Sequence, residues 1–123
     1  MSMAPPLFSV CSASDAVKAL LGTSPVRLWP FGEAAQGAAK PYAVWQVVGG
    51  APENYINEPP DVDRFVVQVD VYADTGASAR SVAETLRDAI EPHAHITAWR
   101  GESRDQETRL FRFSFDVGWI VQR

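Results

Sequence analysis

The fold is decided by the stretch RFVVQVDVYADTGASARSVAETLRDAI, which runs from Arg64 to Ile90. Its first part, ending at Tyr72, alternates apolar and polar residues, and this pattern predicts a β-strand with one buried face. The apolar face of that strand is formed by Phe65, Val67, Val69 and Val71. After Asp74 and Thr75, either of which can cap a helix, apolar residues recur at helical spacing. The stretch therefore predicts a strand followed by an amphipathic helix.

Two more strands are predicted on the C-terminal side of this unit. His95–Arg100 is predicted to form a strand, followed by a charged turn at Gly101–Glu107. Arg109–Val121 carries the strongest strand signal in the chain, because large apolar residues occupy every second position. These residues are Phe111, Phe113, Phe115, Val117, Trp119 and Val121.

The N-terminal side supplies one more clear strand and one more helix. Tyr42–Val48 alternates and is rich in β-favouring residues, whereas Val26–Trp29 allows at most a short strand. Ser14–Leu21 has helical spacing, with a sequence resembling a capping box at Ser12–Asp15 and a stop at Gly22. We therefore expect one α+β domain over residues 1–123. It has two layers, a mainly antiparallel sheet of about four strands with two helices packed on one face.

Composition limits the classes of function. With 11 Lys and Arg against 15 Asp and Glu, the net charge is -4, which disfavours nucleic-acid binding through phosphates. Cys11 is the single cysteine, so the chain has no intrachain disulfide and no cysteine-clustered zinc site. No apolar stretch is long enough to span a bilayer and the start of the chain lacks the pattern of a signal peptide, so we expect a soluble protein.

The sequence offers little catalytic or metal-binding chemistry. His93 and His95 would point to the same side of an extended chain, but two ligands are too few for structural zinc. The acidic residues between Glu53 and Asp63 do not follow the spacing of a calcium loop. No serine has the sequence context of an activated nucleophile. We expect no enzyme activity, no catalytic residues, no cofactor and no metal.

The segment Gly49–Asp63 is expected to be a long exposed loop. Glycines and prolines interrupt any strand ladder there, and the segment is acidic. Loops of this length without secondary structure are uncommon in compact domains and are usually functional. We predict that this loop contacts a partner. The candidate contact residues are Glu53, Asn54, Tyr55, Ile56, Glu58 and Asp61.

Four motifs in this order give the chain a family resemblance. Pro41–Gln46 reads P-Y-x-V-x-Q, and Gly50–Asn54 reads G-x-P-E-N at the start of the acidic loop. Gln68–Ala73 reads Q-V-D-V-Y-A, and Ala77–Ile90 is rich in alanine and arginine. This arrangement resembles the tail-completion, or tail-terminator, proteins of long-tailed phages. The closing Phe-rich strand and the N-terminal helix match in position and character.

The resemblance implies a structural virion protein. Such proteins form a homohexameric ring at the head-proximal end of the tail tube, stop its polymerisation and present a surface to the head. The implied partners are the chain itself, the major tail tube protein and the head-tail connector protein, with assembly in the host cytoplasm. The particle could be a phage, a prophage or a gene transfer agent. Two alternatives remain at this stage: a small-molecule-binding or regulatory α+β module, and an enzyme.

Overall fold

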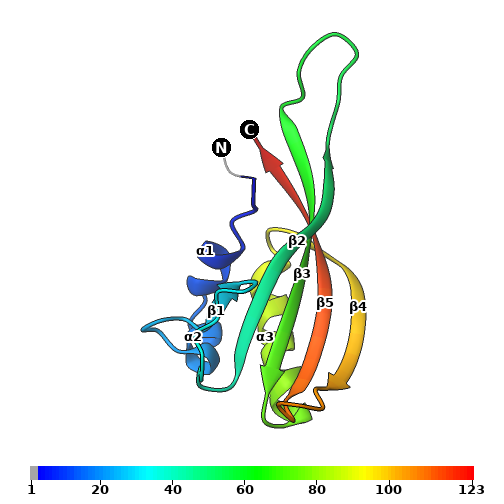
Figure 1. Cartoon of the computed structure of the whole chain (residues 1–123). Coiled ribbons are helices and arrows are strands. Elements are labelled where there is room, and N and C mark those ends of the chain that lie inside the picture. The colour runs from blue at the N-terminus through cyan, green and yellow to red at the C-terminus, as the bar shows by residue number, and fades with distance from the viewer. Residues whose placement is uncertain (1–2) are drawn as a thin grey trace.

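The computed structural model describes residues 3–123, which form a five-stranded sheet and three helices (Figure 1). The strands lie in the order β1-β2-β3-β5-β4, and the neighbouring pairs are antiparallel except for the short parallel pair of β1 and β2. In chain order the elements are α1 (Leu7–Ser12), α2 (Asp15–Leu21), β1 (Leu28–Pro30), β2 (Tyr42–Pro52), β3 (Val62–Ala73), α3 (Gly76–Ile90), β4 (His95–Arg104) and β5 (Phe111–Gln122).

The helices cover one face of the sheet and leave the other face open. α3 packs against β3 and β5, and α1 and α2 pack on α3 (Figure 1). The expected alternation holds, because every second residue of β3 from Phe65 to Ala73 is buried. Removal of such apolar surface from water, at about 25 cal/mol per Å², is the main force that holds the layers together. The predicted α+β class with a mostly antiparallel sheet is confirmed, with five strands and three helices rather than four and two.

The first helix was not expected from the sequence, and the predicted capping box is wrong. Ser12 is the last residue of α1, and Ser14 instead caps α2 by accepting a hydrogen bond from the Val17 amide at 3.3 Å. A six-residue helix has little intrinsic stability, so tertiary packing decides whether it forms. Leu7 and Cys11, one turn apart, are both 0% exposed and provide that packing.

The predicted long loop is also wrong at both of its ends. β2 continues to Pro52 and β3 begins at Val62, so only residues 53–61 are loop. The register shifts by one residue between Val47 and Gly49, which marks a β-bulge that lets the ladder continue through the glycines. Gly50 has a φ of 150°, and a Cβ there would lie 2.2 Å from the Arg64 carbonyl oxygen, so this close strand pairing needs glycine.

Two C-terminal boundaries differ from the prediction for a related reason. β4 includes residues 101–104, which were expected to form a charged turn, because bulges after Ile96 and Trp99 keep it paired with β5. The turn is shorter and is organised by Asp105, whose carboxylate accepts from the Glu107 and Thr108 amides at 2.8 and 3.1 Å. These hydrogen bonds hold the pKa of Asp105 below its ordinary value.

The boundary of β1 also differs from the prediction. β1 occupies Leu28–Pro30, slightly later than the predicted residues 26–29.

Candidate partner-binding surface

The far part of the β2–β3 hairpin projects beyond the body of the sheet as an arm (Figure 1). We use "arm" for residues 49–66 and "arm loop" for residues 53–61. The last ladder contact before the loop is the hydrogen bond from the Glu53 amide to the Val62 carbonyl, at 2.9 Å. An ion pair of 3.1 Å between Arg64 and Glu53 spans the same place. The strands of the hairpin therefore hold the arm loop away from the core.

All six predicted contact residues lie on the arm loop and are exposed: Glu53, Asn54, Tyr55, Ile56, Glu58 and Asp61. Ile56 is 98% exposed and Tyr55 is 48% exposed, so neither side chain is packed into the core. The Tyr55 hydroxyl donates a hydrogen bond of 2.8 Å to the Asp61 carboxylate, and this bond raises the pKa of Tyr55. The hydrogen bond joins the two sides of the loop and leaves Ile56 as an apolar side chain in solvent.

Arg123, which follows directly after β5, forms hydrogen bonds with the end of the arm loop. Its backbone amide donates to the Asp61 carbonyl at 2.9 Å, and its guanidinium donates to the Pro60 carbonyl at 3.2 Å. The same guanidinium forms a bidentate ion pair with the Asp63 carboxylate, with nitrogen–oxygen distances of 2.8 and 3.0 Å. Arg123 thus contacts three residues at the point where the loop returns into β3.

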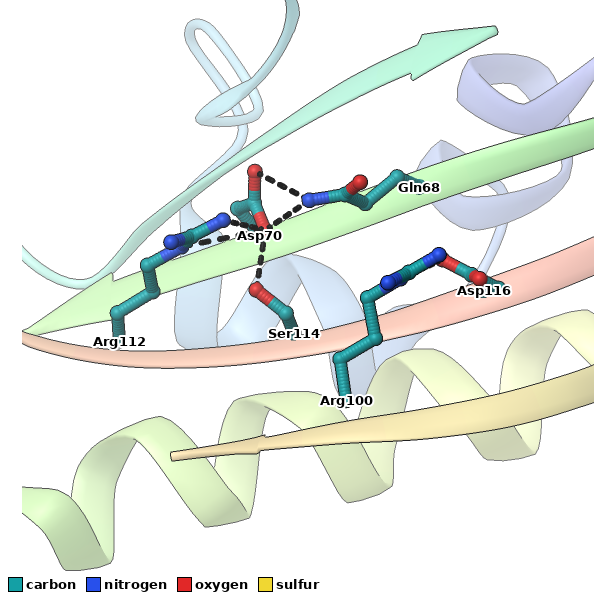
Figure 2. A network of polar contacts seen from close by, with 6 residues as sticks. All are labelled: Gln68, Asp70, Arg100, Arg112, Ser114 and Asp116. Atoms are coloured by element: carbon teal, nitrogen blue, oxygen red, sulfur yellow. Dashed lines mark hydrogen bonds and ion pairs between the residues drawn. The ribbon is translucent and has the colours of Figure 1, made fainter. Parts of the chain in front are cut away.

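A second cluster of polar side chains lies on the open face of the sheet (Figure 2). Asp70 on β3 accepts hydrogen bonds from Gln68, from Arg112 at 3.0 Å and from the Ser114 hydroxyl. Beside it, Asp116 on β5 pairs with Arg100 on β4 at 2.8 Å (Figure 2). Each carboxylate is therefore neutralised by an arginine from a neighbouring position in the sheet.

These contacts fix the pairing of strands rather than create a reactive site. Ser114 and Asp116 are buried, each at 5% exposure, although they lie on the face without helices. Buried polar groups require partners, so Asp70 and Asp116 favour the observed register over a shifted one. The alternation in β3 predicts that Gln68 and Asp70 lie on its polar face, but this pattern does not reveal the cluster. The sequence feature that could have indicated the cluster is the alternation of the polar residues Arg112, Ser114 and Asp116 with the aromatic residues of β5.

Comparison with known proteins gives this architecture a family. Residues 5–122 match the family described as tail completion protein gp17. The chain belongs to the tail completion protein family. It is therefore a structural protein of a phage-type tail, as the resemblance of its motifs implied.

A solved structure shows the same fold. One chain of the virion of a native gene transfer agent particle superposes on this protein with a TM-score of 0.71 at 16% sequence identity. The match covers 95% of this chain and 92% of the other. At this identity the likeness establishes the fold alone. No curated protein sequence matches the chain.

The groups with possible chemistry in this tail completion protein are dispersed. His93 lies in the turn after α3 and His95 begins β4. Within residues 3–123, no three His, Cys, Asp or Glu side chains are close enough to hold a metal ion. Burial raises the pKa of Cys11 to about 12, which keeps its thiol protonated and unreactive. None of the helices in the described part of the chain is long and apolar enough to cross a membrane.

Proposed function

We propose that this tail completion protein forms a homohexameric ring on the head-proximal end of the tail tube. In this position it stops addition of the major tail tube protein and offers the joining surface to the head-tail connector protein. It works by assembly and not by catalysis, and it stays in the finished virion after assembly in the host cytoplasm. The observation that carries the proposal is the family match over residues 5–122.

The shape of the subunit supports an assembly role. The arm presents Ile56 and Tyr55 to solvent, with Glu58 and Asp61 beside them. An exposed apolar side chain costs free energy in water that a partner surface recovers on binding. We therefore propose that Tyr55 and Ile56 anchor the arm loop on the tube or the connector. The exposed acids Glu53, Glu58 and Asp61, with Asn54, then set its orientation against a basic partner surface.

Electron microscopy of particles made without this protein tests the proposal. A tail terminator predicts tails of uncontrolled length and heads that are not joined to tails. Supplying the protein in trans restores normal length and joining. Tails of normal length that are joined to heads in the deletion strain would contradict both parts of the proposed function.

A further inference from the structure

Within residues 3–123, the sheet leaves strand edges unpaired on both of its sides. β4 forms one edge, because it is the last strand in the order β1-β2-β3-β5-β4. β1 forms the other edge but has only three residues, and it pairs with β2 only from Ala43 to Trp45. Within residues 3–123, no strand pairs with residues 46–52 on the side of β2 away from β3. The upper part of β2 is therefore a second edge.

The β2 edge carries no charged side chain that would prevent pairing. Edge strands commonly carry charged side chains that prevent another strand from adding to them. Residues 46–52 read QVVGGAP and contain no charge, with Pro52 only at the far end. Val47 and Val48 are 37% and 42% exposed. A groove of about 380 Å³ runs beside this edge and is lined by Met3, Val47, Gly49, Gly50, Ala51, Pro52, Asp63, Arg64 and Phe65.

The β4 edge offers a matching apolar side chain. Trp99 is 51% exposed, although one of its sides packs on the rings of Phe113 and Phe115. In the ladder Trp99 pairs with Phe115, Phe115 with Val69, and Val69 with Trp45. Trp99 thus lies on the helix side of the sheet, in the same row as Trp45. Val47 is two residues further along β2 and is on that same side.

Strand direction allows the two edges to meet. β2 is antiparallel to β3, β3 to β5, and β5 to β4, so β4 runs opposite to β2 (Figure 1). When copies are related by rotation about an axis close to the strand direction, β4 of one copy lies antiparallel to β2 of the next. The two surfaces differ, so the contact is heterologous and repeats from copy to copy until the ring closes.

We propose that β4 of one copy adds to residues 46–52 of the next copy, with Trp99 placed in the groove beside Val47. Residues 95–101 are long enough to cover this seven-residue edge. Because β1 already pairs with residues 43–45 of β2, the added strand lies next to β1 on the side towards the arm. This inference rests on the proposed ring and names the contact that closes it. It also explains why β1 ends after three residues, since a longer β1 would occupy the pairing edge.

Cross-linking between paired cysteines tests the contact. The double variant Val48→Cys/Ala98→Cys places one thiol on each edge, while the native Cys11 is buried and does not interfere. A short bismaleimide, which tolerates a small error in register, should give a ladder of covalent oligomers up to the closed ring. Each single variant should give no ladder, because a heterologous contact never places two copies of one position together. The control pair Val48→Cys/Ser81→Cys, with the second thiol on the exposed side of α3 and outside the hollow that Trp99 lines, should also give none.

The outcomes separate this inference from the proposed function. The assembly state is measured independently by native mass spectrometry and by microscopy of rings on tail tubes. Rings without the cross-linked ladder, or links formed by either single variant, would overturn the edge contact and leave the ring intact. Absence of rings both in solution and on tubes would overturn the ring and the contact together. Rings with the ladder only in the double variant support both.

A charge on the edge gives a second test. Val48→Lys should lower the fraction of protein in rings by about tenfold or more without changing the melting temperature, because an edge lysine blocks strand addition. Ser81→Lys is the control: this residue is exposed on α3, outside the sheet, and its replacement should leave ring formation unchanged. Equal loss of rings in both variants, or no loss in either, would contradict the proposed contact.

Discussion

Arg123 and Asp63 form a bidentate ion pair, 2.8 and 3.0 Å long, that joins the end of β5 to the start of β3, where the arm loop ends. The pair joins residues 60 positions apart in the chain. The Arg123 side chain is 43% exposed, so solvent weakens the pair, which contributes to the geometry of the arm more than to overall stability. The arm loop therefore depends on β5 for its position as well as on its own hairpin.

The first prediction concerns the titration of this pair. The hydrogen bonds and charge of Arg123 hold the pKa of Asp63 below its ordinary value of 3.8. Because the pKa of Asp63 is lowered by folding, the ion pair contributes to the free energy of unfolding at neutral pH. This contribution is lost as the pH falls through the pKa of Asp63 in the folded protein. Carbon-detected NMR of the Asp63 carboxyl should show a midpoint below 3.8, and Arg123→Ala should move it upwards. An identical midpoint in the variant would show that Arg123 does not control this carboxylate.

The second prediction uses the two adjacent glycines of β2. Gly50→Ala should destabilise the protein by about 1–3 kcal/mol, because its Cβ meets the Arg64 carbonyl at a backbone angle that suits glycine. Gly49→Ala is the control, since its Cβ would meet nothing within 4 Å. Urea unfolding of the two variants measures the difference. Equal stability of the two alanine variants would mean that β2 and β3 do not approach as closely at Gly50.

The sequence predicts local pattern well and long-range pairing poorly, and the arm shows why. The alternation in β3 and β5 and the periodicity of α3 follow from burial of one face, which a linear pattern records. The sequence pattern predicts that Gly49 and Gly50 break the ladder, whereas in the structure a bulge at this place lets the ladder continue. That outcome depends on the residues of the partner strand β3 that lie opposite the glycines, which a pattern within β2 does not record. The burial of Asp116 depends on Arg100 in the same way.

The third prediction concerns the polar cluster on the open face. Asp70→Ala should cost about 1–3 kcal/mol, because it leaves the buried Ser114 hydroxyl without its acceptor. Arg112→Ala should cost less, since the arginine side chain is 38% exposed and its loss leaves Asp70 with Ser114 and Gln68 as donors. Denaturant unfolding of both variants and of the double variant gives the coupling between the two residues. A larger loss for Arg112→Ala than for Asp70→Ala would reverse the proposed order of importance.

The fourth prediction concerns the contact between helix and sheet. Leu86 lies in the apolar stripe of α3 and is 1% exposed. Leu86→Ala should lower the free energy of unfolding by about 2–5 kcal/mol, and Leu86→Asp should prevent folding because it buries an unpaired charge. Glu84→Ala, on the exposed side of the same helix, should be nearly neutral. An unchanged melting temperature for Leu86→Ala would be incompatible with the two-layer packing.

The last prediction tests the arm loop as a partner contact, by replacing Tyr55 and Ile56 together with serine. Neither side chain is buried in the subunit, so the melting temperature of the isolated protein should hardly change. Particle assembly should nevertheless fail, because the loop loses both of its apolar anchors for the tube or the connector. The measurement pairs thermal unfolding of the purified subunit with a count of joined, infectious or transducing particles.

A matched control separates the arm loop from exposed apolar surface in general. Ile120→Ser removes a side chain that is 64% exposed on β5, so it should leave both stability and assembly unchanged. The arm variant also loses the hydrogen bond between Tyr55 and Asp61, and Tyr55→Phe with Ile56 intact isolates that effect. Assembly should survive Tyr55→Phe, because the ring and Ile56 still present apolar surface to the partner. A large loss of stability in the serine double variant, or normal particles despite it, would show that the arm loop serves the subunit's own fold and contacts no partner.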